Sequence, residues 1–196
     1  MRDPFGRIPP SPRQKGYRTI AVARSENDGL NELHLVGLLA LSDPLRPDSK
    51  SMIDEARKLG VRPIMLTGDH ISIAKEIASQ AGIGKNIIRM GDIAGLTEDE
   101  QVRVVGESDG FAEIYPEDKY KIVRLLQSRG HMVGMTGDGV NDAPALKQAE
   151  MGMAVSNATD VAKASASVVL TEPGINVIIN VIPTMSGIPL IRIHGT

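Results

Sequence analysis

Residues 136–144 read Thr-Gly-Asp-Gly-Val-Asn-Asp-Ala-Pro, and this stretch decides the fold that the sequence predicts. It follows an apolar run at residues 131–135 and precedes a helical pattern over residues 143–150. This order indicates a buried strand, a glycine-rich turn and the start of a helix. Gly137 and Gly139 let the backbone bend tightly at the turn.

Two acids of this stretch suggest a metal site. Asp138 and Asp142 lie four residues apart, on or near the turn, where both carboxylates can face one metal ion. Mg²⁺ favours carboxylate oxygens and usually keeps several of its waters. The first hypothesis is therefore a Mg²⁺-dependent phosphoryl site at the end of a strand. The alternative is a surface turn, because Gly, Asn and Asp are common in turns. Nine consecutive residues of this kind favour the site.

The composition excludes several classes of protein. The 196 residues are 41% apolar, enough for a real core, and with two Phe, three Tyr and no Trp that core must be aliphatic. The net charge of −2, with no basic stripe, argues against a nucleic-acid binder. The absence of cysteine excludes disulfides, thiolate zinc sites and Cys nucleophiles. Because no run approaches the roughly 20 apolar residues of a membrane span, we expect the chain as given to be soluble.

Strand and helix patterns alternate from residue 17 onward. The expected strands are 17–23, 33–41, 62–66, 87–89, 111–115, 131–135, 152–155 and 167–170. The expected helices are 49–59, 71–80, 97–105, 116–128, 143–150 and 159–164, with Asp48 and Thr97 as caps of the first and third. Short apolar strands in this order predict an α/β fold with a doubly wound, mostly parallel sheet. Ligands of such sheets bind beyond the carboxyl ends of the strands.

Three segments are expected along the chain. Residues 1–16 hold four prolines and several charges, and are typical of a tail or linker. Residues 17–182 form the α/β domain. Residues 183–196 are expected to be a C-terminal tail, in which Pro183, Gly187 and Pro189 oppose a helix.

Two further elements could join the paired acids at the edge of the sheet. Thr67, Gly68 and Asp69 follow the strand at 62–66, and a hydroxyl with loop amides at a helix N-terminus can hold a phosphoryl oxygen. The alternative is a plain N-cap turn. Lys119, early in the helix after Pro116, could neutralise phosphoryl charge, although a single lysine is more often only solvated. Asn141 could hydrogen-bond within its loop or to phosphate oxygens.

The order Thr, Lys and paired Asp resembles the haloacid dehalogenase-like phosphotransferases. Three segments make the resemblance narrower: Thr67–Asp69, Tyr115–Lys119 and Met135–Lys147 are similar to the phosphorylation domain of P-type cation-transporting ATPases. Residues 42–46 and 15–23 resemble further elements of that family, the second at the end of the nucleotide-binding domain. The similarity covers about residues 14–182, and residues 151–154, 159–163 and 170–174 are most like the plasma-membrane proton pumps.

The resemblance implies roles for individual residues and a setting for the whole. Thr67 and Gly68 would hold the transferred phosphoryl group, and Lys119 would offset its charge. Asp138 would bind Mg²⁺, with Asp142 supporting the metal or the attacking water. Arg18 and Arg46 would contact the phosphates of ATP or hold two domains together on it. Asp69 would lie near the nucleotide. The parent would hydrolyse ATP through an aspartyl-phosphate and move a cation, with H⁺ favoured, from the cytoplasmic face of a membrane together with the pump's other domains.

One departure from the family concerns the nucleophile. These ATPases phosphorylate the Asp of an Asp-Lys-Thr-Gly-Thr motif, and the 196 residues contain no such motif. We therefore expect it upstream of residue 1 and the isolated chain to be inactive. If the missing strand is central, its loss predicts an unpaired edge in the sheet. The alternatives are a stand-alone phosphatase with Asp43 as its nucleophile, and a non-catalytic module that binds Mg²⁺ and phosphate.

Overall fold

The computed structural model describes residues 18–25, 33–41, 44–172 and 190–195. The chain divides into two compact units, residues 1–44 and residues 45–196. The boundaries expected at residues 16 and 182 lie outside the described residues and stay predictions. The division after Pro44 was not expected from the sequence.

The first unit contains an antiparallel hairpin. Strand β1 (Arg18–Ser25) pairs with β2 (Leu33–Leu41), with an irregularity in the register after Val22. Both expected strands are confirmed. The five leucines of β2 are 48–58% exposed, although its run of apolar residues is typical of a strand that is covered on both faces.

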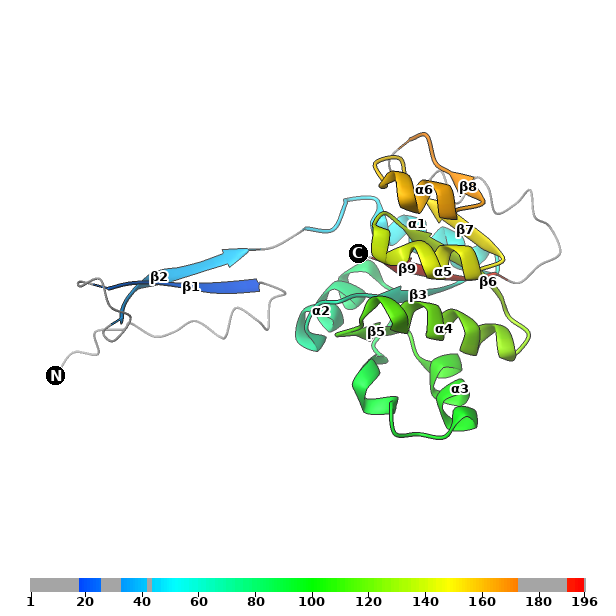
Figure 1. Cartoon of the computed structure of the whole chain (residues 1–196), viewed down its shortest axis with the longest axis horizontal. Coiled ribbons are helices and arrows are strands. Elements are labelled where there is room, and N and C mark those ends of the chain that lie inside the picture. The colour runs from blue at the N-terminus through cyan, green and yellow to red at the C-terminus, as the bar shows by residue number, and fades with distance from the viewer. Residues whose placement is uncertain (1–17, 26–32, 42–43, 173–189, 196) are drawn as a thin grey trace. The chain divides into compact units, whose positions relative to one another are not determined.

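The second unit is built on a sheet of seven strands, in the order β4-β5-β3-β9-β6-β7-β8 (Figure 1). Every pair of neighbouring strands is parallel. The strands are β3 (Arg62–Leu66), β4 (Ile87–Arg89), β5 (Gly110–Ala112), β6 (Met132–Gly137), β7 (Met151–Ala154), β8 (Val168–Val169) and β9 (Leu190–Gly195). The predicted α/β class with a doubly wound parallel sheet is confirmed.

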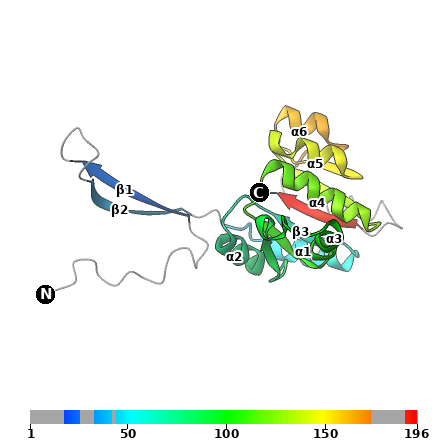
Figure 2. The same ribbon diagram turned by 60° about the horizontal axis from the view of Figure 1, so that its bottom comes forward.

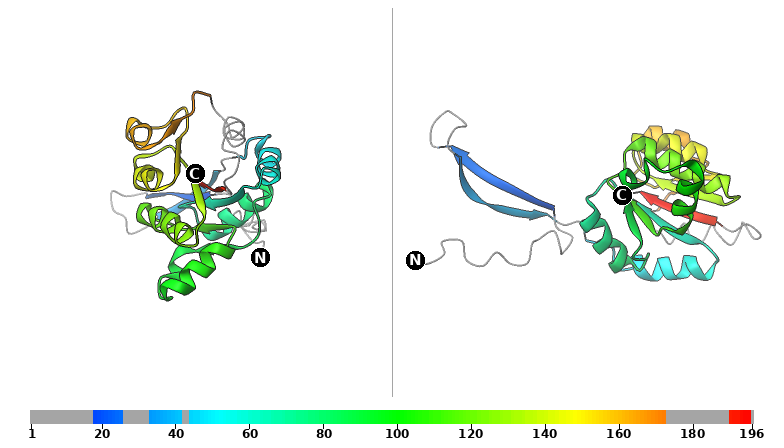
Figure 3. Two further views of the ribbon diagram at one scale, coloured as in Figure 1. Left: turned by 90° about the vertical axis from the view of Figure 1, so that its right-hand side faces the viewer. Right: turned by 90° about the horizontal axis from the view of Figure 1, so that it is seen from below.

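Helices cover both faces of this sheet (Figure 3). The helices are α1 (Ser49–Lys58), α2 (Ile71–Ala81), α3 (Glu98–Glu107), α4 (Pro116–Ser128), α5 (Ala143–Gln148) and α6 (Asp160–Ser165), with 3-10 turns at Met90–Ile93 and Val140–Asp142. Side chains of α1 and α2 pack with Met65 and Ala112, whereas those of α3 to α6 pack with Leu66, Phe111 and Met135. The two sets of contacts place α1 and α2 on one face and the other helices on the opposite face.

The core is aliphatic, as the composition predicts. Its largest cluster lies on the side of α3 to α6 and surrounds Phe111, which is fully buried. A smaller cluster under α1 joins Ala56 and Val61 to Met151 and Met153 of β7. Both faces of β3, β5, β6 and β7 are thus buried, which explains the nearly continuous apolar sequences of these strands.

The helix limits follow local sequence chemistry. Pro116 opens α4, where its missing N–H costs nothing, and Gly82 ends α2 with φ 72°. Thr97 and Glu100 form the expected capping box of α3. The expectation for Asp48 was wrong in its detail. Asp48 is the N-cap of α1, but its side chain accepts no capping hydrogen bond, and its carbonyl accepts one from the Ser51 hydroxyl instead.

Strand β9, the red arrow in Figure 2, lies in the middle of the sheet. Its neighbours are β3 and β6. It pairs with β3 from Arg62 to Leu66 and with β6 from Met132 to Thr136. The sequence predicted only a tail over residues 183–196, so this strand was missed. The expected unpaired edge is accordingly wrong, because β9 occupies the space between β3 and β6.

Candidate active site

The two motifs with candidate site residues end at the same edge of the sheet. Thr67 follows the last residue of β3, and Asp138 follows the last residue of β6. Leu66 pairs with Gly195 of β9, and Thr136 pairs with His194, so the two strand ends lie at similar heights. With one strand between them, their backbones are separated by two strand spacings, roughly 10 Å. A phosphate group can therefore lie between the loops.

The loop after β3 is organised by the side chain of Thr67, which is 2% exposed. Its hydroxyl accepts a hydrogen bond from the Asp69 backbone N–H at 3.1 Å and donates to Asp69 Oδ2 at 3.2 Å. Gly68, between them, is exposed. The loop thus presents its glycine to solvent while Thr67 and Asp69 hold its shape.

The start of α2 is less open than the sequence predicted. The Ile71 backbone N–H donates to Glu113 Oε1 at 3.0 Å, and the Ser72 N–H donates to His70 Nδ1 at 3.3 Å. These amides already have acceptors within the chain. A phosphoryl contact with these two amides is therefore not available in this structure, and a contact with the loop of residues 67–70 stays a prediction.

Lys119 lies in the first turns of α4 and points to the loop after β6. The Tyr115 backbone N–H donates to Asp118 Oδ2 at 2.8 Å, which fixes the start of the helix. The Lys119 Nζ lies 2.6 Å from Asp142 Oδ1, and the two side chains are 12% and 4% exposed. The lysine is thus a nearly buried, paired cation, and the alternative of a merely solvated Lys119 is wrong.

Asp142 holds the loop after β6 from within. Its Oδ1 accepts from Lys119, and its Oδ2 accepts from the backbone N–H groups of Asp138 and Gly139 at 3.1 and 3.2 Å. A Cβ on Gly137 would lie 2.5 Å from the Asp142 Cβ, so glycine is needed there for close approach. Asp142 therefore shapes the turn, and its expected contact with a metal ion stays a prediction.

Asp138 and Asn141 are the exposed polar groups of this loop. The Asp138 carbonyl accepts a hydrogen bond from the Thr159 N–H at 2.8 Å, which leaves its carboxylate on the solvent side of an anchored backbone. In the part of the chain that the structure describes, no group of three or more His, Cys, Asp or Glu side chains could hold a metal. This donor set still fits Mg²⁺, which commonly binds one or two carboxylates together with water and substrate phosphate.

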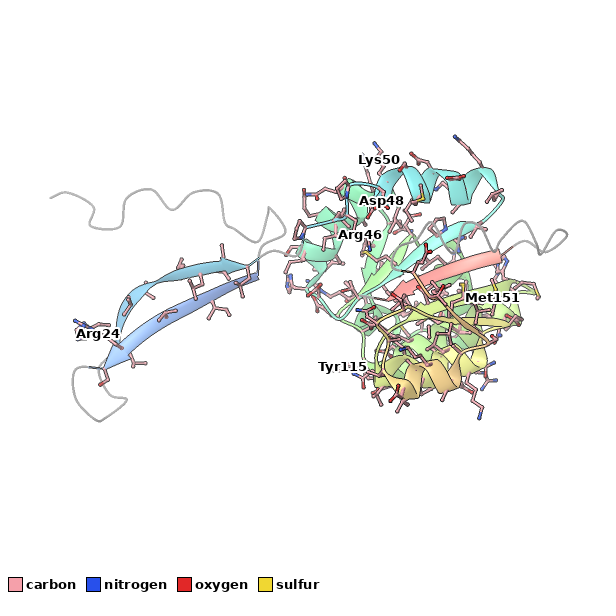
Figure 4. All side chains as sticks on the ribbon, turned by 90° about the horizontal axis from the view of Figure 1, so that it is seen from above. Arg24, Arg46, Asp48, Lys50, Tyr115 and Met151 are labelled. Carbon is pink, nitrogen blue, oxygen red and sulfur yellow. The ribbon has the colours of Figure 1, made fainter. Side chains whose placement is uncertain are left out.

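The remaining predicted residues lie in other parts of the chain. Arg46 and Asp48 lie side by side before α1, with Nε and Oδ1 3.7 Å apart (Figure 4). Arg18 belongs to the hairpin unit, and Asp43 lies outside the described residues. The roles expected for Arg18, Arg46 and Asp43 therefore stay predictions.

One residue of the site was missed. Glu113 borders the loop of residues 67–70, and its Oε1 lies 3.1 Å from Arg89 Nε and 3.6 Å from His70 Nε2. The hydrogen bond from the Ile71 N–H, together with the hydrogen bond and the charge of Arg89, lowers the pKa of the Glu113 carboxyl. Nothing in the sequence pattern distinguishes this acid, because it lies within the expected strand at residues 111–115 and belongs to no motif.

Comparison with known proteins agrees with this arrangement. Residues 12–150 match the haloacid dehalogenase-like hydrolases. A protein of Methanocaldococcus jannaschii, named as a cation-transporting ATPase, is 49% identical over 175 residues, which are 86% of this chain and 21% of that protein. Plasma membrane ATPase 2 of Saccharomyces cerevisiae is 44% identical over 87% of this chain and 18% of its own length.

Solved structures give the same answer for the fold. The crystal structure of a zinc-transporting PIB-type ATPase superposes with a TM-score of 0.61 and 30% identity, over 87% of this chain and 23% of that one. The chain thus spans about a fifth of the length of the relatives it matches. No helix within the described ranges has the length and apolar character to cross a bilayer.

Proposed function

Because the chain belongs to the haloacid dehalogenase-like hydrolase family and matches P-type cation-transporting ATPases, we propose that it is the phosphorylation domain of such a pump. The parent protein hydrolyses ATP through an aspartyl-phosphate on the cytoplasmic face of a membrane and moves a cation. The resemblance of residues 151–154, 159–163 and 170–174 to plasma-membrane proton pumps favours H⁺ as that cation.

The buried pair of Lys119 and Asp142 is the observation that carries this proposal. Burying a charged side chain costs free energy. A lysine and an aspartate that are only 12% and 4% exposed at the carboxyl ends of the strands therefore point to a functional role. The pair fixes the backbone of Asp138 through the second oxygen of Asp142. The loop after β6 is thus held in one shape, with the Lys119 ammonium buried against it and the Asp138 carboxylate exposed. This arrangement suits phosphoryl transfer, which depends mostly on the positions and charges of the surrounding groups.

Each residue has a part in this proposal. Gly68 and the loop fixed by Thr67 hold phosphoryl oxygens, while the ammonium of Lys119 offsets their charge. Asp138 holds Mg²⁺, which neutralises charge on the phosphate when it is bound. Asp142 keeps Lys119 and the Asp138 loop in place, and Asn141 lies exposed on the same loop. Arg46 and Asp69 lie on the side proposed for ATP, and the role expected for Arg18, which belongs to the other unit, stays a prediction.

The Asp-Lys-Thr-Gly-Thr motif does not occur in these 196 residues, so we expect the chain to bind phosphate with Mg²⁺ without turning over ATP. Phosphate binding can be measured by ³¹P NMR titration with and without Mg²⁺, and turnover by release of phosphate from ATP. The expected result is Mg²⁺-dependent binding that Asp138→Asn weakens at least tenfold, with no turnover. Asp92→Asn, at an exposed acid of the 3-10 turn after β4, is the matched control.

Three outcomes would change the proposal. Absence of any Mg²⁺-dependent phosphate binding would contradict it. Sustained ATP turnover that Asp43→Asn abolishes would instead support the stand-alone phosphatase, and a beryllium fluoride adduct mapped to Asp43 would identify that nucleophile. Binding of the wild type that Asp92→Asn and Asp138→Asn weaken equally would exclude a specific metal role for Asp138.

A further inference from the structure

We propose that Glu113 is a positioning residue, which holds the phosphate loop of residues 67–70 in register with the helix that carries Lys119. This inference deepens the proposed function and rests on it. Glu113 itself lies beside the loop and acts through the groups that it fixes.

The backbone of Glu113 is the first argument. Its φ is 56°, and in the described part of the chain it is the one non-glycine residue with positive φ. A side chain is disfavoured in this conformation, which glycine adopts freely. The turn brings its N–H to the Asp69 carbonyl at 3.0 Å and the Ile114 N–H to the Thr67 carbonyl at 3.3 Å. Segment 113–114 therefore pairs with both ends of the Thr67-Gly68-Asp69 loop.

The side chain supplies the second argument. Its Oε1 accepts from the Ile71 N–H at 3.0 Å and from Arg89 Nε at 3.1 Å, with His70 Nε2 at 3.6 Å. One carboxylate thus joins the start of α2 to the end of β4 at the exit of β5. Glycine would relieve the backbone but could make none of these contacts. The need for the carboxylate explains why a side chain is present at a strained position.

Glu113 also lies on the direct path from the loop to Lys119. Ile114 and Tyr115 follow it, and Tyr115 lies at the surface of the unit, where α4 starts (Figure 4). Because Pro116 and the Tyr115–Asp118 hydrogen bond fix the first turn of α4, the position of Lys119 depends on where residues 113–115 leave the loop. Anchoring Glu113 therefore sets the Thr67 loop and the Lys119 ammonium relative to each other.

The test compares Glu113→Gly and Glu113→Gln with wild type in the full chain. The glycine variant removes the backbone strain together with the carboxylate, whereas the glutamine variant keeps the shape and loses the charge toward Arg89. We expect Glu113→Gly to unfold at the same or higher urea concentration, yet to bind inorganic phosphate with Mg²⁺ about tenfold more weakly. The phosphate affinity of Glu113→Gln should lie between those of wild type and Glu113→Gly. Glu107→Gln, at an exposed acid ending α3, is the control.

Hydrogen exchange of the Asp69 amide gives a readout that does not depend on phosphate. This amide donates to Thr67 Oγ1, so its exchange should accelerate several-fold in Glu113→Gly while amides in the middle of α4 stay unchanged. Unchanged affinity and unchanged Asp69 exchange would overturn the inference, as would a loss of affinity that only follows a loss of stability. If wild type binds no phosphate, the proposed function fails, and the exchange data alone decide the role of Glu113.

Discussion

At the scale of single residues, the buried contact between Lys119 and Asp142 dominates the site. Removing one partner of a buried ion pair leaves an uncompensated charge, which typically costs about 3–5 kcal/mol. We therefore expect Lys119→Met to lower the free energy of unfolding by about 3 kcal/mol, measured by urea denaturation. Lys121→Met, two residues further along α4, should change it by less than about 0.5 kcal/mol.

The Lys119 prediction has a clear contrary outcome. A Lys119→Met variant as stable as the Lys121→Met control would show that Asp142 finds water or another donor. The double variant Lys119→Met with Asp142→Asn should recover much of the loss, because it leaves no unpaired charge and the amide oxygen can still accept from the Asp138 and Gly139 N–H groups.

Several site residues could be predicted from the sequence, and others could not. Thr67 and Asp138 follow apolar strands, and parallel strands bring their carboxyl ends to one edge. That rule is independent of side-chain detail, so it places both loops correctly. The burial of Asp142 and the role of Glu113 depend instead on tertiary contacts between segments far apart in sequence, and no local pattern reports these.

At the scale of elements, β7 and α5 make a close backbone contact. A Cβ on Gly152 would lie 2.2 Å from the carbonyl oxygen of Leu146, which is backbone and has little room to move. Gly152→Ala should therefore lower the free energy of unfolding by about 1–3 kcal/mol through overpacking. Gly91→Ala, where a Cβ meets nothing within 4 Å, is the matched control in urea denaturation.

If Gly152→Ala leaves the free energy of unfolding unchanged, α5 can shift away from β7 without cost. The position of the Lys119–Asp142 pair would then be less rigid than the packing implies, because α5 directly follows the turn that contains Asp142. A changed ³¹P titration in that variant would reveal such a shift.

The limits of helices and strands were predictable where a proline or a glycine marks them in the sequence. Helix α4 runs from Pro116 to Ser128, as the sequence predicts, since proline fixes its first turn. Strand limits differ by a few residues: the run expected at 111–115 is a strand only over Gly110–Ala112. The chain turns at Glu113, whose positive φ leaves no trace in an apolar pattern.

At the scale of the whole molecule, stability should depend on β9. Proline lacks the N–H that a central strand needs for its ladder, and it is tolerated mainly at sheet edges. We expect Ile193→Pro to lower the free energy of unfolding by about 2–4 kcal/mol in urea. Val169→Pro, in the edge strand β8, should cost less. Equal effects of the two variants would contradict a central position of β9.

The sequence did not predict β9 because the residues just before it favour a tail. Leu190–Gly195 is a short run with two isoleucines, which alone would favour a strand, but Pro189 and Gly187 before it favour a tail. The doubly wound class still followed from the other strands. Which segment completes the centre of a sheet depends on pairing across the whole chain, and periodicity contains no information about that.

The position of β9 has a consequence for how the molecule forms. Strands β4, β5 and β3 make one half of the sheet and β6, β7 and β8 the other, and β9 is the strand that joins them. Arg62 pairs with Ile191, so this junction closes a loop that encloses most of the unit, and such distant contacts slow folding. Refolding should therefore be slow, because neither half of the sheet is complete until β9 pairs with both.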